Sequence, residues 1–158
     1  KAYENGEDRE ARRNMMIAST IGGMAFISSN VGAVHAFAET VGAWFDTPHG
    51  VANSLFLPYI MEFNIPACPE RFADIADAMG IEREESMSDE QYALKAVEYV
   101  KALNRKLNIP TIKEIKGITE ERFEAIAERS ANNVLSNDNA RKITKEDYLE
   151  LLKKAYNE

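Results

Sequence analysis

The sequence VGAVHAFAETVGAWFDTPHGVAN, residues 31–53, decides the fold of this chain. Apolar residues recur at intervals of three and four between Val31 and Val41, which predicts an amphipathic helix toward Trp44. The residues that follow, Asp46-Thr47-Pro48-His49-Gly50, are typical of a turn, and the proline can also begin the next helix. The stretch therefore predicts two helices joined by a sharp corner.

Both histidines of the chain lie in this stretch, His35 within the first predicted helix and His49 directly after the turn proline. Imidazole is the commonest metal ligand, and its charge changes near neutral pH. A sharp corner can bring the two rings to one metal ion although 14 residues separate them. Two ligands do not fill a coordination sphere, so histidines that only form hydrogen bonds in the core are the alternative.

Four other side chains near the histidines are candidates for a site. Glu39 follows His35 by one helical turn, where it could orient a ligand, accept from a metal-bound water or act as a third ligand; exposure to solvent is the alternative. Phe26, Trp44 and Phe45 could line an apolar substrate pocket, but aromatic residues at such spacing are also typical of an ordinary core. Asp46 is expected to be a turn residue.

Outside this stretch the chain is also predicted to be helical. The spacing of apolar residues and the capping signals predict helices from Asp8 to about Phe26, from Pro48 through a kink at Pro58, over Pro69–Met79, after Ser88, over Thr119–Val134 and after Thr144. No segment shows sustained period-two alternation. The sequence therefore predicts an all-α bundle of roughly seven helices with almost no strand.

Composition narrows the class of protein. A chain of 158 residues with 45% hydrophobic and 28% charged residues is expected to form one globular unit. Its net charge of -7 argues against a nucleic-acid partner. Few charges occur between Asn14 and Pro69, but the many Gly, Ser, Thr and Asn residues there favour helices buried in protein over a membrane span. Cys68 is the only cysteine, which excludes an internal disulfide and favours a cytoplasmic protein.

Several familiar motifs are absent. The chain has no glycine-rich phosphate loop, and neither a serine nor a cysteine nucleophile has the local partners that activate it. The acidic stretch from Glu82 to Glu90 lacks calcium-loop spacing and is expected to be a solvated connection. The chain opens with Lys1 and shows no signal segment, so we expect it to be a piece of a longer protein.

Several short sequence motifs resemble those of a known family. The segments at residues 22–35, 47–53 (TPHGVAN) and 57–64 (LPYIMEFN) closely resemble the iron-containing (group III) alcohol dehydrogenase family. Residues 8–12 (DREAR) resemble the family's lead-in helix, and Asn139-Ala140-Arg141 resembles its Asn-Pro-Arg with alanine in place of proline. The resemblance covers the whole chain.

The resemblance implies that residues 1–158 are the α-helical C-terminal metal-binding domain of a two-domain dehydrogenase, whose N-terminal dinucleotide-binding domain is absent from this chain. In that family one Asp and three His hold a divalent metal, and His35 and His49 match the last two of these ligands. The other two lie four residues apart on a helix upstream of Lys1. The resemblance further implies NAD or NADP as coenzyme, iron as the first choice of metal with zinc as the second, and a small alcohol or aldehyde as substrate.

Two positions refine this expectation. Many relatives place a further histidine near the nicotinamide four residues after the first matched ligand, where this chain has Glu39; we assign Glu39 to the catalytic site but not the histidine's proton-relay role. Phe26 aligns with a position that lines the substrate pocket. The isolated chain is expected to bind metal weakly and to be inactive. A non-enzymatic interaction module with structural histidines, or a domain of a zinc-dependent polyol dehydrogenase, is the alternative; the exact substrate and any homo-oligomer stay open.

Overall fold

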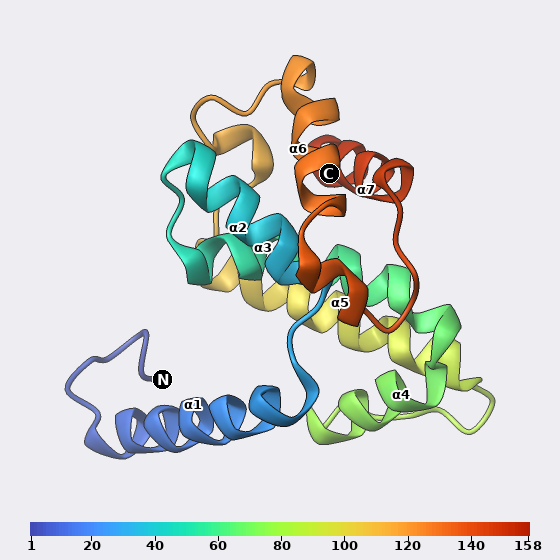
Figure 1. Cartoon of the computed structure of the whole chain (residues 1–158). Coiled ribbons are helices and arrows are strands. Elements are labelled where there is room, and N and C mark those ends of the chain that lie inside the picture. The colour runs from blue at the N-terminus through green and yellow to red at the C-terminus, as the bar shows by residue number, and fades with distance from the viewer. The chain divides into compact units, whose positions relative to one another are not determined.

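The computed structural model describes all residues, 1–158, and contains seven α-helices, four short 3-10 helices and no strand (Figure 1). The predicted all-α fold and the number of helices are confirmed. The chain divides into two compact units, residues 1–31 and residues 32–158.

The first unit contains a single long helix, α1 (Arg9–Ser29). The carboxylate of Asp8 caps it by accepting a hydrogen bond of 2.9 Å from the N–H of Ala11. The helix continues three residues beyond the predicted end at Phe26 and stops at Asn30, whose φ of 61° lies in the left-handed region. The polar cluster at residues 28–30 therefore forms the end of the helix, as its composition predicts.

The second unit contains the other six α-helices. They are α2 (Ala33–Phe45), α3 (His49–Asn64), α4 (Pro69–Ala78), α5 (Asp89–Lys106), α6 (Phe123–Ala131) and α7 (Lys145–Asn157). The short 3-10 helices are η1 (Ile65–Ala67), η2 (Ile112–Glu114), η3 (Glu120–Arg122) and η4 (Val134–Asp138). The predicted starts after Ser88 and Thr144 are confirmed, because both residues form capping boxes.

The predicted helix over Thr119–Val134 is wrong in its extent. This region consists of η3, the nine-residue helix α6 and the beginning of η4. Thr119 makes no side-chain capping bond, and the first turn after it is a 3-10 turn. The α-helix itself begins only at Phe123, whose side chain is buried in the core.

Helix α3 contributes to two hydrophobic cores. In the first core it packs with α2, α6 and α7, and the ring of Phe37 stacks on Phe56 at 4.2 Å and meets the ring of Tyr148 edge-on at 4.6 Å. In the second core the end of α3, with Met61 and Ile65, packs against α4 and α5. One helix thus ties together the two halves of the second unit.

Pro58 lies inside α3, which continues through it from His49 to Asn64; the kink expected at Pro58 stays a prediction. A proline has no N–H, which leaves the carbonyl of the residue four positions earlier without its helical partner. Here the carbonyl oxygen of Ser54 accepts a hydrogen bond of 2.6 Å from Nδ2 of Asn104 on α5. A side chain from the neighbouring helix therefore satisfies the group that Pro58 leaves free.

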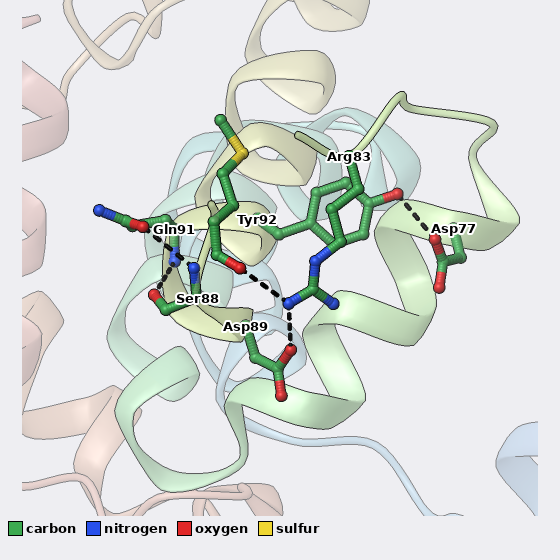
Figure 2. A network of polar contacts seen from close by, with 7 residues as sticks. Asp77, Arg83, Ser88, Asp89, Gln91 and Tyr92 are labelled. Atoms are coloured by element: carbon green, nitrogen blue, oxygen red, sulfur yellow. Dashed lines mark hydrogen bonds and ion pairs between the residues drawn. The ribbon is translucent and has the colours of Figure 1, made fainter. Parts of the chain in front are cut away.

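The acidic connection between α4 and α5 is exposed and is held by one arginine, Arg83 (Figure 2). Its guanidinium donates to the carbonyl oxygen of Met87 at 3.0 Å and to Asp89 at 2.6 Å, and lies 5.0 Å from the centre of the Tyr92 ring. The hydroxyl of Tyr92, a buried residue, lies 2.8 Å from a carboxylate oxygen of Asp77. Burial raises the pKa of Tyr92 above its ordinary value, and the bond to Asp77 raises it further. The contacts are those of a solvated connection, as the sequence predicts.

The weakly charged region between Asn14 and Pro69 contains parts of α1, α2 and α3. No single helix is both long and apolar enough to cross a bilayer, although α1 and α2 taken together meet that requirement by length and composition. Within α2, six of the thirteen residues are buried inside the protein.

Candidate metal centre

His35 and His49 lie beside each other at the corner between α2 and α3. His35 is in the first turn of α2, and His49 is the first residue of α3. The connection is tight: Asp46 adopts the left-handed conformation with φ of 50°, and a Cβ on Gly42 would lie 3.2 Å from the carbonyl oxygen of Thr47. The centres of the two imidazole rings are 5.3 Å apart, with their planes tilted by 51°. The corner thus brings together the two rings that the sequence singles out.

This separation suits two ligands of one metal ion. With metal–nitrogen bonds of about 2.0–2.1 Å, two imidazoles on the same ion have ring centres roughly 4.5–5.5 Å apart. Burial lowers the pKa of His35 below its ordinary value of 6.5, and the nearby His49 lowers it further, whereas Glu39 acts in the opposite direction. The lowered pKa favours the neutral form of His35, which is the form in which imidazole binds metal.

The surroundings of His49 are polar. Nδ2 of Asn53, one turn further along α3, lies 3.1 Å from Nε2 of His49 and donates to the His49 carbonyl oxygen at 2.9 Å. Two buried oxygen atoms on the same corner, Oγ1 of Thr47 and Oδ1 of Asn53, have no hydrogen-bond partner within the chain. Buried oxygens without a partner are costly, so a water, an ion or another polar group is expected to complete this corner.

The two histidines are not joined by a third side chain of a metal-binding type. No group of three or more His, Cys, Asp or Glu side chains lies close enough together to hold an ion. Glu39 does not form such a group with the two histidines in this structure, and its assignment to the site stays a prediction. Two imidazoles fill only part of a coordination sphere, so the pair fits a metal only together with further ligands.

Glu39 has a definite position although it is exposed. It lies one turn after His35 on α2, and its Oε2 accepts a hydrogen bond of 2.7 Å from Nδ2 of Asn133. Asn133 precedes η4 and is 94 residues away in the sequence. Nothing in the sequence around Asn133 indicates this partner, so sequence reasoning did not find it.

The three candidate aromatic residues are divided between the two units of the chain. Phe26 lies on α1, in the separate unit of residues 1–31, so its assignment to a substrate pocket stays a prediction. Phe45 packs against the first hydrophobic core, whereas Trp44 is 39% exposed and has the guanidinium of Arg129 at 5.3 Å from its ring centre. For Phe45 the ordinary core role is the better description.

Cys68 takes no part in this corner. It lies between η1 and α4, and burial raises the pKa of its thiol above the ordinary value. A protonated thiol is a poor nucleophile, in agreement with the expectation that Cys68 is an ordinary small residue.

Two of the sequence motifs quoted above contact each other next to the start of α2. Asn64 and Asn139 exchange two amide hydrogen bonds of 2.7 and 3.0 Å. Asn64 is the last residue of the LPYIMEFN motif, and Asn139 is the first residue of the Asn-Ala-Arg motif. Oδ1 of Asn139 also accepts from the N–H of Ala33 at 3.3 Å, two residues before His35. Both motifs can be recognised in the sequence, but the sequence does not indicate that they contact each other.

The fold and this corner define a helical domain that places two imidazole rings side by side. The C-terminal model of the Fe-containing alcohol dehydrogenase family matches residues 1–156, and the chain belongs to this family.

Individual relatives agree in sequence and in fold. The lactaldehyde reductase of Escherichia coli (strain K12) is 38% identical over 149 residues, which are 94% of this chain and 39% of that protein. The NADPH-dependent butanol dehydrogenase of Clostridium saccharobutylicum is 34% identical, over 99% of this chain and 40% of its own length. The structure of an alcohol dehydrogenase from Oenococcus oeni superimposes with a TM-score of 0.92 at 40% identity, covering 98% of this chain and 40% of that one. The chain thus spans about two fifths of the length of these relatives.

Proposed function

We propose that this chain is the metal-binding C-terminal domain of an alcohol dehydrogenase that interconverts small alcohols and the corresponding aldehydes or ketones. The observation that carries the proposal is the 5.3 Å separation of the His35 and His49 rings in a domain of this family. The similarity to a lactaldehyde reductase and a butanol dehydrogenase supports the class of substrate.

His35 and His49 would hold a divalent ion, which when bound supplies Lewis acidity toward an alcohol or carbonyl oxygen. We propose iron as this ion, with zinc as the second choice, because a site of imidazole and carboxylate suits both. The remaining ligands, an Asp and a His, are proposed to lie upstream of Lys1.

A nicotinamide coenzyme, NAD or NADP, would supply the hydride chemistry from a dinucleotide-binding domain outside this chain. The coverage of only about 40% of the relatives leaves room for such a domain. This chain then contributes one wall of the site, with the two histidines and the Glu39 carboxylate on it. Phe26 is proposed to line the substrate pocket. We propose the cytoplasm as the compartment because the chain has a single cysteine and so no internal disulfide.

The test is the variant His49→Ala in the full-length protein that contains this chain, with metal content and alcohol oxidation as the measurements. We expect loss of both, because one of the two imidazoles is removed. The matched control is Cys68→Ala, which removes another residue of a metal-binding type from a place away from the corner and is expected to leave both unchanged.

His35→Ala should reproduce the loss, and thermal unfolding of the metal-free variants checks that each one folds. A His49→Ala protein with normal metal content would refute the ligand assignment. A change only in stability or in partner binding would favour a non-enzymatic module, and zinc in the purified enzyme would favour a polyol dehydrogenase. The isolated 158-residue chain, assayed in parallel, is expected to show weak metal binding and no turnover.

A further inference from the structure

The contact between Asn133 and Glu39 joins two elements that the sequence does not connect. The amide of Asn133 has only one orientation that satisfies both of its ends: its Oδ1 accepts from the N–H of Leu135 at 3.0 Å, at the start of η4. Its Nδ2 therefore points away from η4, toward Oε2 of Glu39 at 2.7 Å. A rotated amide would place an oxygen against the carboxylate and lose both bonds.

The position of Asn133 is fixed relative to α2 by a buried chain of hydrogen bonds. Oγ of Ser130, at the end of α6, donates to Oγ1 of Thr40 on α2 at 3.2 Å. Oγ of Ser136 donates to the carbonyl oxygen of Ser130 at 2.7 Å and lies 2.7 Å from the hydroxyl of Tyr148. All four side chains are at most 8% exposed. The corner that carries Asn133 is therefore attached to the residue next to Glu39.

One oxygen of the Glu39 carboxylate stays available. Oε2 is occupied by Asn133, whereas Oε1 makes no hydrogen bond within the chain. Because residues four apart share one face of a helix, this carboxylate lies on the same side of α2 as His35. A long, exposed glutamate is ordinarily mobile, and a charge-assisted bond to a fixed amide restricts it to one place.

We propose that Asn133 is a positioning residue that holds the Glu39 carboxylate so that Oε1 accepts a hydrogen bond from the substrate hydroxyl. This inference rests on the proposed function of the chain. It assigns to Glu39 the part of a fixed hydrogen-bond acceptor, and it assigns to a residue 94 positions away the task of setting its orientation.

The test uses Asn133→Asp in the full-length, metal-loaded protein. Aspartate caps a helix start as well as asparagine does, so the bond from the Leu135 N–H is kept, but the N–H donor to Glu39 is lost. We expect an unfolding temperature close to that of the wild type and a fall of about 10- to 100-fold in kcat/KM for short primary alcohols, in the range for a lost bond to a charged group. Asn137→Asp, an exposed change of the same charge in η4, is the control and should leave both unchanged.

The variant Glu39→Gln separates positioning from a general effect on the fold. In that background Asn133→Asp should cause no further fall in kcat/KM, because there is no carboxylate left to position. The side-chain amide protons of Asn133 should also shift in the NMR spectrum of Glu39→Gln, a readout independent of turnover.

Asn133→Asp with kcat/KM within twofold of the wild type would overturn the inference, as would an equal fall with and without the Glu39 carboxylate. A metal-loaded wild type that turns over no alcohol would instead overturn the proposed function, and with it the substrate hydrogen bond, so the two failures are distinguishable.

Discussion

Replacing Asn139 by alanine tests whether the contact between the two family motifs, residues 57–64 and 139–141, stabilises the fold. Asn139 exchanges two amide hydrogen bonds with Asn64, accepts from the N–H of Ala33 and donates to the carbonyl oxygen of Arg141 at 2.8 Å. Asn64 is 7% exposed, so the variant leaves a buried amide without partners. The four bonds contribute about 0.5–1.5 kcal/mol net each, which is roughly 2–6 kcal/mol together. The orphaned amide adds to the loss, but the bond from Ala33 is long at 3.3 Å and the bond to Arg141 is exposed, so we expect a value near the middle of this range. We expect the free energy of unfolding to fall by about 3–4 kcal/mol.

The assay is urea unfolding of the 158-residue chain, followed by circular dichroism, with the slope of the transition compared between variants. Asn137→Ala, an exposed change two residues earlier in η4, is the control and should change the free energy of unfolding by less than about 0.5 kcal/mol. The double variant Asn64→Ala with Asn139→Ala should lose about 1–2 kcal/mol less than the sum of the single variants, because no orphaned amide remains. A loss below about 1 kcal/mol for Asn139→Ala, or strict additivity of the pair, would refute this reasoning.

Two further predictions concern the same unit. Gly32→Ala should destabilise the chain by about 1–3 kcal/mol in the urea assay, because the new Cβ would lie 3.0 Å from Oδ1 and 3.2 Å from Cα of Asn139; an unchanged midpoint would show that the backbone moves aside. Tyr148 is fully buried, and burial raises its pKa from 10.0 to about 12, against a smaller opposing effect of the hydrogen bond to Ser136. Its contribution is complete below pH 10 and is lost between pH 10 and 12, where only the unfolded chain ionises, by at most about 2.7 kcal/mol. Unfolding free energies of Tyr148→Phe measured over this range should fall less steeply than those of the wild type, and equal slopes would contradict the assignment.

The helix starts could be predicted from the sequence because capping is local. Ser88 and Thr144 each bond to a residue three positions later, and Asp8 does the same. The interruption between Thr119 and Val134 could not be predicted, because it depends on which side chains reach the core. Helix α6 begins at Phe123, whose side chain is buried in the core. A capping signal between residues three positions apart does not indicate which side chains are buried.

The candidate site, like the helices, could be predicted from the sequence only in part. The histidine pair could be predicted because a turn of a few residues places His35 and His49 together. Their exact partners could not, since Glu39 and Asn133 are 94 residues apart and Asn64 and Asn139 are 75 apart. Helical periodicity shows which face of a helix is buried but not which other helix covers it.

Two contacts with residues far away in the sequence fix the position of α2, and His35 lies on the segment between them. Near its start, the N–H of Ala33 bonds to Asn139; further along, Thr40 bonds to Ser130 through buried hydroxyls. His35 lies between these two anchors, so its ring is directed by the fold before any ion arrives. Ligands placed in advance cost less conformational entropy on binding. The loss of Asn139 should therefore weaken metal binding as well as folding, although Asn139 lies outside the proposed ligand set.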